Sequence, residues 1–132
     1  MAKKAIICVD DEAIVLLAVK EEVHQGLGGE FMVEGVLTAF AAMDKMKAFA
    51  EQGVDTVLVI TDWLMPGVKG DVLLKMVREK FPGTRAIMIT GQADEEAMQR
   101  VLKEGLAGKV LRKPWDAQEL IEAIKNLCAE KE

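Results

Sequence analysis

The sequence of 132 residues is long enough for one domain with an ordinary hydrophobic core and no covalent staples. Its composition, 51% hydrophobic and 30% charged, excludes intrinsic disorder. A net charge of −5, with no run of Lys or Arg longer than two, argues against direct binding to nucleic acid or to an anionic membrane surface.

The first predicted element begins close to the N-terminus, where MAKKAIICVDDE holds a run of only five apolar residues before two aspartates. Such a run is too short for a signal peptide or a spanning helix, so we expect a cytoplasmic protein with no membrane insertion. Cys8 lies in that run, and Cys128 lies near the other end of the chain, without the spacing of a metal site. We interpret Cys8 as a small buried hydrophobic residue.

Apolar runs along the chain predict five short β-strands, over residues 5–9, 31–37, 56–61, 85–90 and 109–112. Apolar residues at helical spacing predict five helices, over residues 12–25, 39–52, 70–81, 94–105 and 116–130. The predicted buried stripes of the third and fourth helices are Val72, Leu73, Met76 and Val77, and Ala97, Val101 and Leu102.

Capping residues support the last two helices. Asp94 and Asp116 each stand at a predicted N-cap, and Glu119 follows Asp116 at the spacing of a capping box. The strand over 31–37 is the least uniform of the five and carries Glu34, so we expect it at the edge of the sheet.

Strand and helix alternate five times, and the strands are continuously apolar. Continuous apolar strands are typical of a parallel sheet that helices cover on both faces. No linker, repeat or low-complexity segment interrupts the alternation. We therefore predict a single doubly wound α/β domain over residues 1–132.

Polar side chains that could bind a ligand or take part in a reaction follow four of the predicted strands. Asp10 and Asp11 follow the first strand, Asp62 follows the third, Thr90 ends the fourth, and Lys113 follows the fifth. In open α/β sheets, ligands bind beyond the carboxyl ends of the strands. Each residue alone could be an ordinary turn or cap residue. Their joint occurrence at one edge favours a functional site.

The charges of this edge do not balance. Carboxylates about 5 Å apart repel by roughly 3 kcal/mol per pair at an effective dielectric constant near 20, and Lys113 offers one positive charge against three negative ones. A hard divalent cation with oxygen ligands such as Mg²⁺, together with an anion, would resolve the imbalance. Asp62 is then a candidate carboxylate nucleophile that forms an acyl phosphate.

The motifs VDDE (residues 9–12), DWLMPGVKG (62–70), TG (90–91) and KP (113–114) resemble, in order and spacing, the receiver domain of two-component response regulators. The resemblance covers essentially the whole chain. It implies a flavodoxin-like, doubly wound α/β fold: a five-stranded parallel sheet of strand order 2-1-3-4-5 with five helices.

The resemblance also implies a role for each residue of the site. Asp62 corresponds to the phosphoacceptor, while Asp10, Asp11, Asp62 and the backbone carbonyl of Leu64 correspond to the Mg²⁺ ligands. Thr90 corresponds to the switch hydroxyl, Lys113 to the ammonium that pairs with the phosphoryl group, and Gly91 to a source of backbone N–H donors. The Lys113–Pro114 peptide bond corresponds to one that is commonly cis.

The implied partners are a sensor histidine kinase or phosphotransfer protein as phosphodonor, and a downstream protein or fused output domain. The chain itself would be a signalling phosphoacceptor and not an enzyme that turns over external substrates. Two alternatives remain open: a receiver-like interaction module that is not phosphorylated, and a phosphatase of the haloacid dehalogenase type. That phosphatase class requires a second aspartate where this sequence has Leu64.

The sequence departs from the family pattern at several positions. Val110 occupies the place of an aromatic residue that is coupled to the switch hydroxyl, and we interpret Trp115 as a hydrophobic anchor for the last helix. Leu64 stands where a polar residue can orient a hydrolytic water, a capacity that Gln92 partly retains. We expect a longer-lived phosphorylated state than in receivers with polar residues at both positions.

Overall fold

A computed structural model describes residues 3–91 and 95–131 of the chain. The strands are β1 (Lys3–Val9), β2 (Met32–Val36), β3 (Val54–Asp62), β4 (Arg85–Thr90) and β5 (Lys109–Arg112). The helices are α1 (Ala13–Leu27), α2 (Ala39–Glu51), α3 (Gly70–Lys80), α4 (Glu95–Lys103) and α5 (Ala117–Lys131). The ten elements alternate as the sequence predicts.

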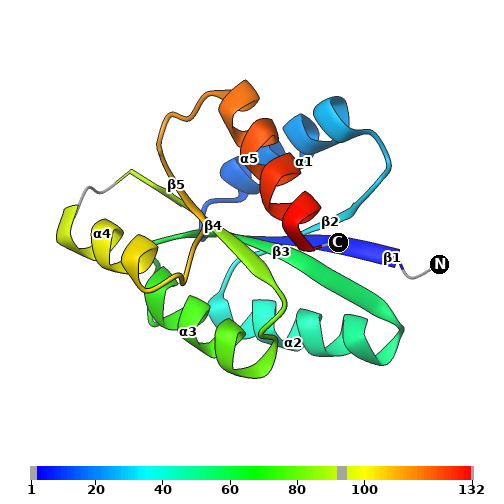
Figure 1. The fold of residues 1–132 in the computed structure, drawn as a ribbon, viewed down its shortest axis with the longest axis horizontal. Coiled ribbons are helices and arrows are strands. Elements are labelled where there is room, and N and C mark those ends of the chain that lie inside the picture. The colour runs from blue at the N-terminus through cyan, green and yellow to red at the C-terminus, as the bar shows by residue number, and fades with distance from the viewer. Residues whose placement is uncertain (1–2, 92–94, 132) are drawn as a thin grey trace.

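The strands form one parallel sheet of order β2-β1-β3-β4-β5, so the predicted topology is confirmed. β2 is an edge strand, as its Glu34 indicated. Figure 1 shows α1 and α5 on one face of the sheet and α2 and α3 on the other. The order in which successive strands are added to the sheet reverses between β1 and β3, and the carboxyl ends of these two strands therefore border the crevice in which such folds bind ligands.

The core is divided by the sheet into two apolar layers. Alternate side chains of β1 point into opposite layers: Ile7 packs with Met46 of α2 and Leu73 of α3, while Ile6 packs with Val19 of α1 and Ile124 of α5. Strands buried on both faces must be apolar throughout, because neither face meets water. This requirement explains the uninterrupted apolar runs in the sequence.

Two predicted stripe positions are wrong. Val72 is 44% exposed and Leu102 is 46% exposed, whereas Leu74, which the predicted stripe omits, is fully buried. A stripe read from spacing alone leaves the rotation of a helix undetermined by about one residue, and packing against the twisted sheet decides it. The stripe positions Leu73, Val77, Ala97 and Val101 are buried as predicted.

The predicted N-cap of α5 is confirmed, since Gln118 N–H donates to Asp116 Oδ1 at 3.2 Å. Glu119, the other residue of the predicted capping box, forms an ion pair with Lys109. Asp94 lies outside the described residues, so its capping role stays a prediction. Cys8 is buried, as expected, and neither cysteine is in a disulfide. None of the helices in the described residues has both the length and the apolar composition that a membrane crossing requires.

Candidate functional site

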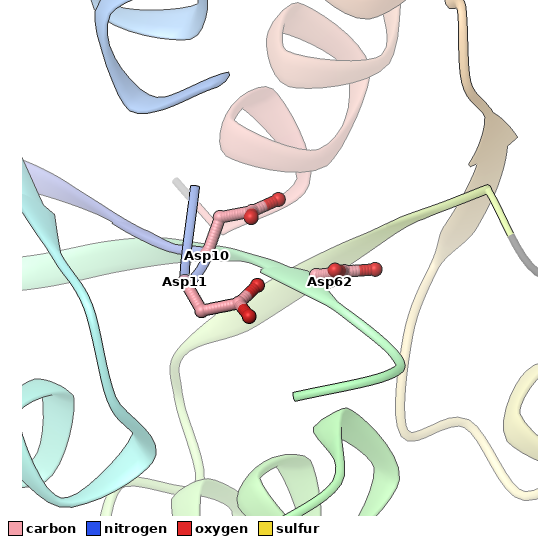
Figure 2. Close-up of side chains that lie close together, drawn as sticks. All are labelled: Asp10, Asp11 and Asp62. Atoms are coloured by element: carbon pink, nitrogen blue, oxygen red, sulfur yellow. The ribbon is translucent and has the colours of Figure 1, made fainter. Parts of the chain in front are cut away.

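The site lies at the carboxyl edge of the sheet. β1 ends at Val9, directly before Asp10 and Asp11, and β3 ends with Asp62 itself. Figure 2 shows these three carboxylates close together where β1 and β3 end. One carboxylate oxygen from each can be chosen so that all three lie within 4.8 Å of one another. The fold thus brings together the acidic residues that the sequence placed at strand ends.

Asp10 is buried, and both of its carboxylate oxygens have partners. Its Oδ1 accepts a hydrogen bond of 2.9 Å from the backbone N–H of Glu12, which precedes α1. Its Oδ2 accepts one of 2.9 Å from Lys113 Nζ. The backbone N–H of Asp10 donates to the carbonyl of Val36 at 3.2 Å, at the end of β2. Asp10 therefore links β1, β2, α1 and the end of β5.

Lys113 brings its ammonium group into the middle of the acids. Nζ lies 2.9 Å from Asp10 Oδ2, 3.4 Å from Asp62 Oδ2 and 3.7 Å from Glu12 Oε1. Burial lowers the pKa of Lys113, but the hydrogen bond that its ammonium donates to Asp10 and the charge of Asp62 outweigh burial and hold the pKa above its usual value. The lysine is therefore charged at neutral pH. The peptide bond between Lys113 and Pro114 is cis, as the resemblance implied.

Burial raises the pKa of the Asp62 carboxyl above its ordinary value of 3.8. The neighbouring ammonium of Lys113 opposes the rise, and the charge of Asp10 adds to it. Asp11, the third carboxylate, is exposed. Two buried acids and one exposed acid are grouped here, and Lys113 is the one cation that the described residues place against them, so negative charge is in excess. Their oxygen donors suit a hard divalent cation. The donor set therefore fits Mg²⁺.

The loop after Asp62 is held close to the start of α3 by Gly70. A Cβ atom at residue 70 would overlap the backbone carbonyl oxygen of Asp62. The N–H of Gly70 donates to the carbonyl of Trp63 at 2.7 Å, and Thr61 Oγ1 donates to the carbonyl of Asp62 at 2.9 Å. Leu64 follows in this loop with its side chain 45% exposed. Only glycine at 70 allows so close an approach, which fixes where Asp62 stands.

Thr90 and Gly91 lie at the end of β4. Thr90 is buried, and its carbonyl accepts a hydrogen bond of 2.9 Å from the N–H of Lys113. Gly91 lies beside the stem of the same lysine, since a Cβ there would be 3.6 Å from Lys113 Cδ. The two residues thus share the edge with Asp62 and Lys113. Gln92 lies outside the described residues.

The sequence that forms this site also matches a known family. The model of the response regulator receiver domain family matches residues 6–125. This chain belongs to that family. Receiver domains are signalling domains, and the strand order of the present one is that of the CheY-like flavodoxin fold.

Two curated relatives and one solved structure illustrate the family. The hydrogenase transcriptional regulatory protein HoxA of Cupriavidus necator is 30% identical over 121 residues, which are 92% of this chain and 23% of HoxA. Hybrid signal transduction histidine kinase D of Dictyostelium discoideum is 29% identical over 98 residues, 73% of this chain and 6% of the kinase. This receiver domain thus spans a small fraction of either relative.

The structure of a CheY-like response regulator receiver domain protein from Methanospirillum hungatei JF-1 superposes with a TM-score of 0.83 at 28% identity. The superposition covers 98% of this chain and 97% of that one. The likeness therefore extends over the whole receiver fold and is not confined to the matched motifs.

Two contacts of this receiver domain were missed from the sequence. The first is the contact of Glu12 with Lys113. The position of Glu12, directly after the acidic pair, could have suggested it. Trp115 packs against the α1–α5 layer as the predicted anchor, and its Nε1 also donates to Glu22 Oε1 at 2.6 Å. No local pattern relates residues 22 and 115, so only the fold could show that second contact.

Proposed function

We propose that Asp62 of this receiver domain accepts a phosphoryl group from a phosphohistidine on a sensor histidine kinase or phosphotransfer protein. The observation that carries the proposal is the placement of the Asp62 carboxylate 3.4 Å from the Lys113 ammonium, within an acidic group that could hold a metal ion. Phosphoryl transfer depends on positioning and charge neutralisation. The fold would position Asp62, and Lys113 together with a metal ion would neutralise charge.

Asp10, Asp11 and Asp62 would hold Mg²⁺, with the backbone carbonyl of Leu64 as a further ligand. When bound, the ion would neutralise charge on the carboxylates and on the phosphoryl oxygens. The oxygen donors and the excess of negative charge on the described side chains support this assignment.

The chain's own residues carry the transfer. A carboxylate oxygen of Asp62 attacks phosphorus, the P–N bond to the histidine breaks, and the imidazole nitrogen keeps the electron pair. Lys113 pairs with a phosphoryl oxygen, and the N–H of Gly91 donates to another. The phosphoryl group adds close to two negative charges beside a buried edge. Loss of the group to water would be the chain's only other chemistry, without turnover of external substrates.

The switch would begin at Thr90, whose hydroxyl moves to bond the phosphoryl group. The neighbouring β5 carries Val110, partly buried against the α2–α3–α4 layer, at the position where the family resemblance implies an aromatic residue. Arg112 of β5 forms an ion pair with Glu95, the first residue of α4. We propose that a shift at Thr90 reaches a downstream protein or a fused output domain through this α4–β5 side.

The proposal places the domain over residues 1–132 in the cytoplasm, where kinases draw on ATP. Two cysteines that form no disulfide suit that reducing compartment. The net charge of −5 gives no reason to expect direct nucleic-acid binding by this domain.

The central test uses wild type and Asp62→Asn with acetyl phosphate or beryllofluoride, with and without Mg²⁺. Intact mass should show one added phosphoryl group in wild type alone, and only with Mg²⁺. The emission of Trp63, which adjoins the acceptor, should change with the same dependence. Asp44→Asn, which removes an exposed charge from α2, serves as the control. Signals indifferent to both Mg²⁺ and Asp62 would leave the unphosphorylated interaction module as the function.

A second test addresses the lifetime of the phosphorylated state. Leu64 is half-exposed in the loop after Asp62 and cannot hydrogen-bond a water. Leu64→Asn should therefore hasten loss of the phosphoryl group several-fold, measured as intact mass against time after the donor is removed. An unchanged decay rate would refute the role given to this position.

A further inference from the structure

Glu12 is a fourth acid at the site, outside the set that would hold the metal ion. Its Oε1 lies 3.7 Å from Lys113 Nζ, and its side chain is 62% exposed. Asp10 and Asp62, the other two carboxylate partners of Lys113 among the described residues, are buried. Glu12 is therefore the partner of Lys113 that stands toward solvent, the side from which a phosphodonor must arrive.

The position of Glu12 does not depend on its own carboxylate. Its backbone N–H donates to Asp10 Oδ1 at 2.9 Å, and its carbonyl accepts from the N–H of Val15 at 3.1 Å at the start of α1. These bonds fix the Cα atom at the rim of the site. The charge of the side chain can therefore be changed without loss of a contact that holds the fold.

Metal binding relieves some of the competition for Lys113, but not all of it. A cation shared by Asp10 and Asp62 would offset the negative charges of these two carboxylates, which now face the Lys113 ammonium. The metal ion would not offset the charge of Glu12 in this way, because Glu12 is not among the carboxylates grouped at the metal position. An incoming phosphoryl group, which needs the ammonium of Lys113, would still compete with Glu12 for it.

We propose that Glu12 makes phosphoryl uptake selective by donor charge, disfavouring free, doubly negative phosphodonors by competing for Lys113 and by repelling the anion. This inference rests on the proposed function of Asp62. A unit charge roughly 7 Å from the reacting group in water changes a rate by about threefold per unit of donor charge. The effect should be about threefold for a singly charged donor and close to ninefold for a doubly charged one at low salt.

The test measures the phosphorylation rate of Glu12→Gln and wild type with two donors at saturating Mg²⁺ and fixed neutral pH. Acetyl phosphate is doubly negative and releases acetate when its P–O bond breaks. Phosphoramidate carries one net negative charge and releases ammonia when its P–N bond breaks. In each transfer the Asp62 oxygen takes the phosphoryl group and the leaving group keeps the electron pair.

Glu12→Gln should gain more rate with acetyl phosphate than with phosphoramidate, and Glu12→Lys should gain more than Glu12→Gln. Beryllofluoride should bind the Gln variant about threefold more tightly, as followed by Trp63 emission. In 1 M NaCl, where the screening length is about 3 Å, these differences should shrink toward none. Glu21→Gln, which removes the same charge from an exposed position further along α1, should match wild type.

The outcomes separate the two proposals. If wild type is not labelled at all, or if Asp62→Asn is labelled equally, the proposed function fails. If wild type is labelled at Asp62 but Glu12→Gln reacts at the same rate or more slowly with both donors, only the role of Glu12 is overturned. Equal gains with the two donors would also overturn it, because a merely structural effect would not depend on donor charge.

Discussion

Asp62→Asn should stabilise the metal-free domain, although it removes an ion pair. At an effective dielectric constant near 20, attraction to Lys113 across 3.4 Å is worth about 5 kcal/mol. Repulsion from a carboxylate oxygen within 4.8 Å is at least about 3.5 kcal/mol, and the site holds two such neighbours, Asp10 and the exposed, better screened Asp11. The two sets of charges nearly cancel, so the burial of the Asp62 carboxylate decides the sign.

We expect a gain in the free energy of unfolding of about 1–2 kcal/mol in the variant, because asparagine has no charge to desolvate and can still accept a hydrogen bond from Lys113. For a domain of this size the melting temperature should rise by about 3–8 °C. Added Mg²⁺ should narrow the difference, since it stabilises the protein that binds it more tightly, and wild type offers one more carboxylate.

The pH dependence follows from the raised pKa of Asp62. Between the ordinary value of 3.8 and the higher folded pKa, the native state holds the extra proton, so stability from this group falls as pH rises. The advantage of Asp62→Asn should therefore be small near pH 3.8 and reach its full size once the pH exceeds the folded pKa.

Urea unfolding in EDTA, followed by circular dichroism at several pH values, measures both the gain and its pH dependence. Asp44→Asn removes an exposed charge from α2 and should leave stability within about 0.5 kcal/mol of wild type. A metal-free Asp62→Asn less stable than wild type at neutral pH would refute the reasoning, because it would mean that the ion pair outweighs burial and repulsion.

Three other variants or reagents probe the same edge and the core beneath it. Lys113→Met should destabilise the metal-free protein by about 2–3 kcal/mol in urea unfolding, since it leaves the buried Asp10 without its cation, and Mg²⁺ should recover part of the loss. Gly70→Ala should cost about 3 kcal/mol and slow phosphorylation, because its methyl group would overlap a backbone carbonyl, whereas Gly29→Ala, with open space around it, should cost under 1 kcal/mol. Burial raises the pKa of the Cys8 thiol to about 12, so a thiol reagent at pH 8 should modify this residue only after unfolding; rapid modification of the folded protein would contradict its placement.

The fold could be predicted because its three central strands, β1, β3 and β4, are buried on both faces. A run such as 56–61, apolar without alternation, has few stable places other than the middle of a helix-covered sheet. Polar Glu34 likewise marked the edge strand correctly. The rotation of α3 and α4 could not be predicted, because Val72 and Leu74 flank the same stripe and only the twist of the sheet decides which of them is buried.

The site could be predicted in its membership but not in its contacts. The carboxyl ends of parallel strands share one edge, so Asp10, Asp62 and Lys113 had to lie at the same edge once the topology was correct. Within the described part of the chain, Lys113 contacts three carboxylates, one of them Glu12, and these contacts depend on the path of a long side chain that no spacing rule describes. The requirement for glycine at residue 70 could not be predicted either, because it arises where the start of α3 approaches the backbone carbonyl of Asp62.

A site so poor in positive charge can persist because the core does not depend on it. The apolar layers on both faces of the sheet are complete below Asp10 and Asp62, so repulsion at the edge lowers stability without disturbing the packing. The proposed metal and phosphoryl group answer this imbalance in opposite ways. The cation reduces the repulsion that an arriving anion would meet, and the anion adds negative charge that holds the cation. Their binding free energies must then be coupled by the same factor in both directions. A neutral or well-paired edge would be more stable, but it would have no such coupling to drive a switch.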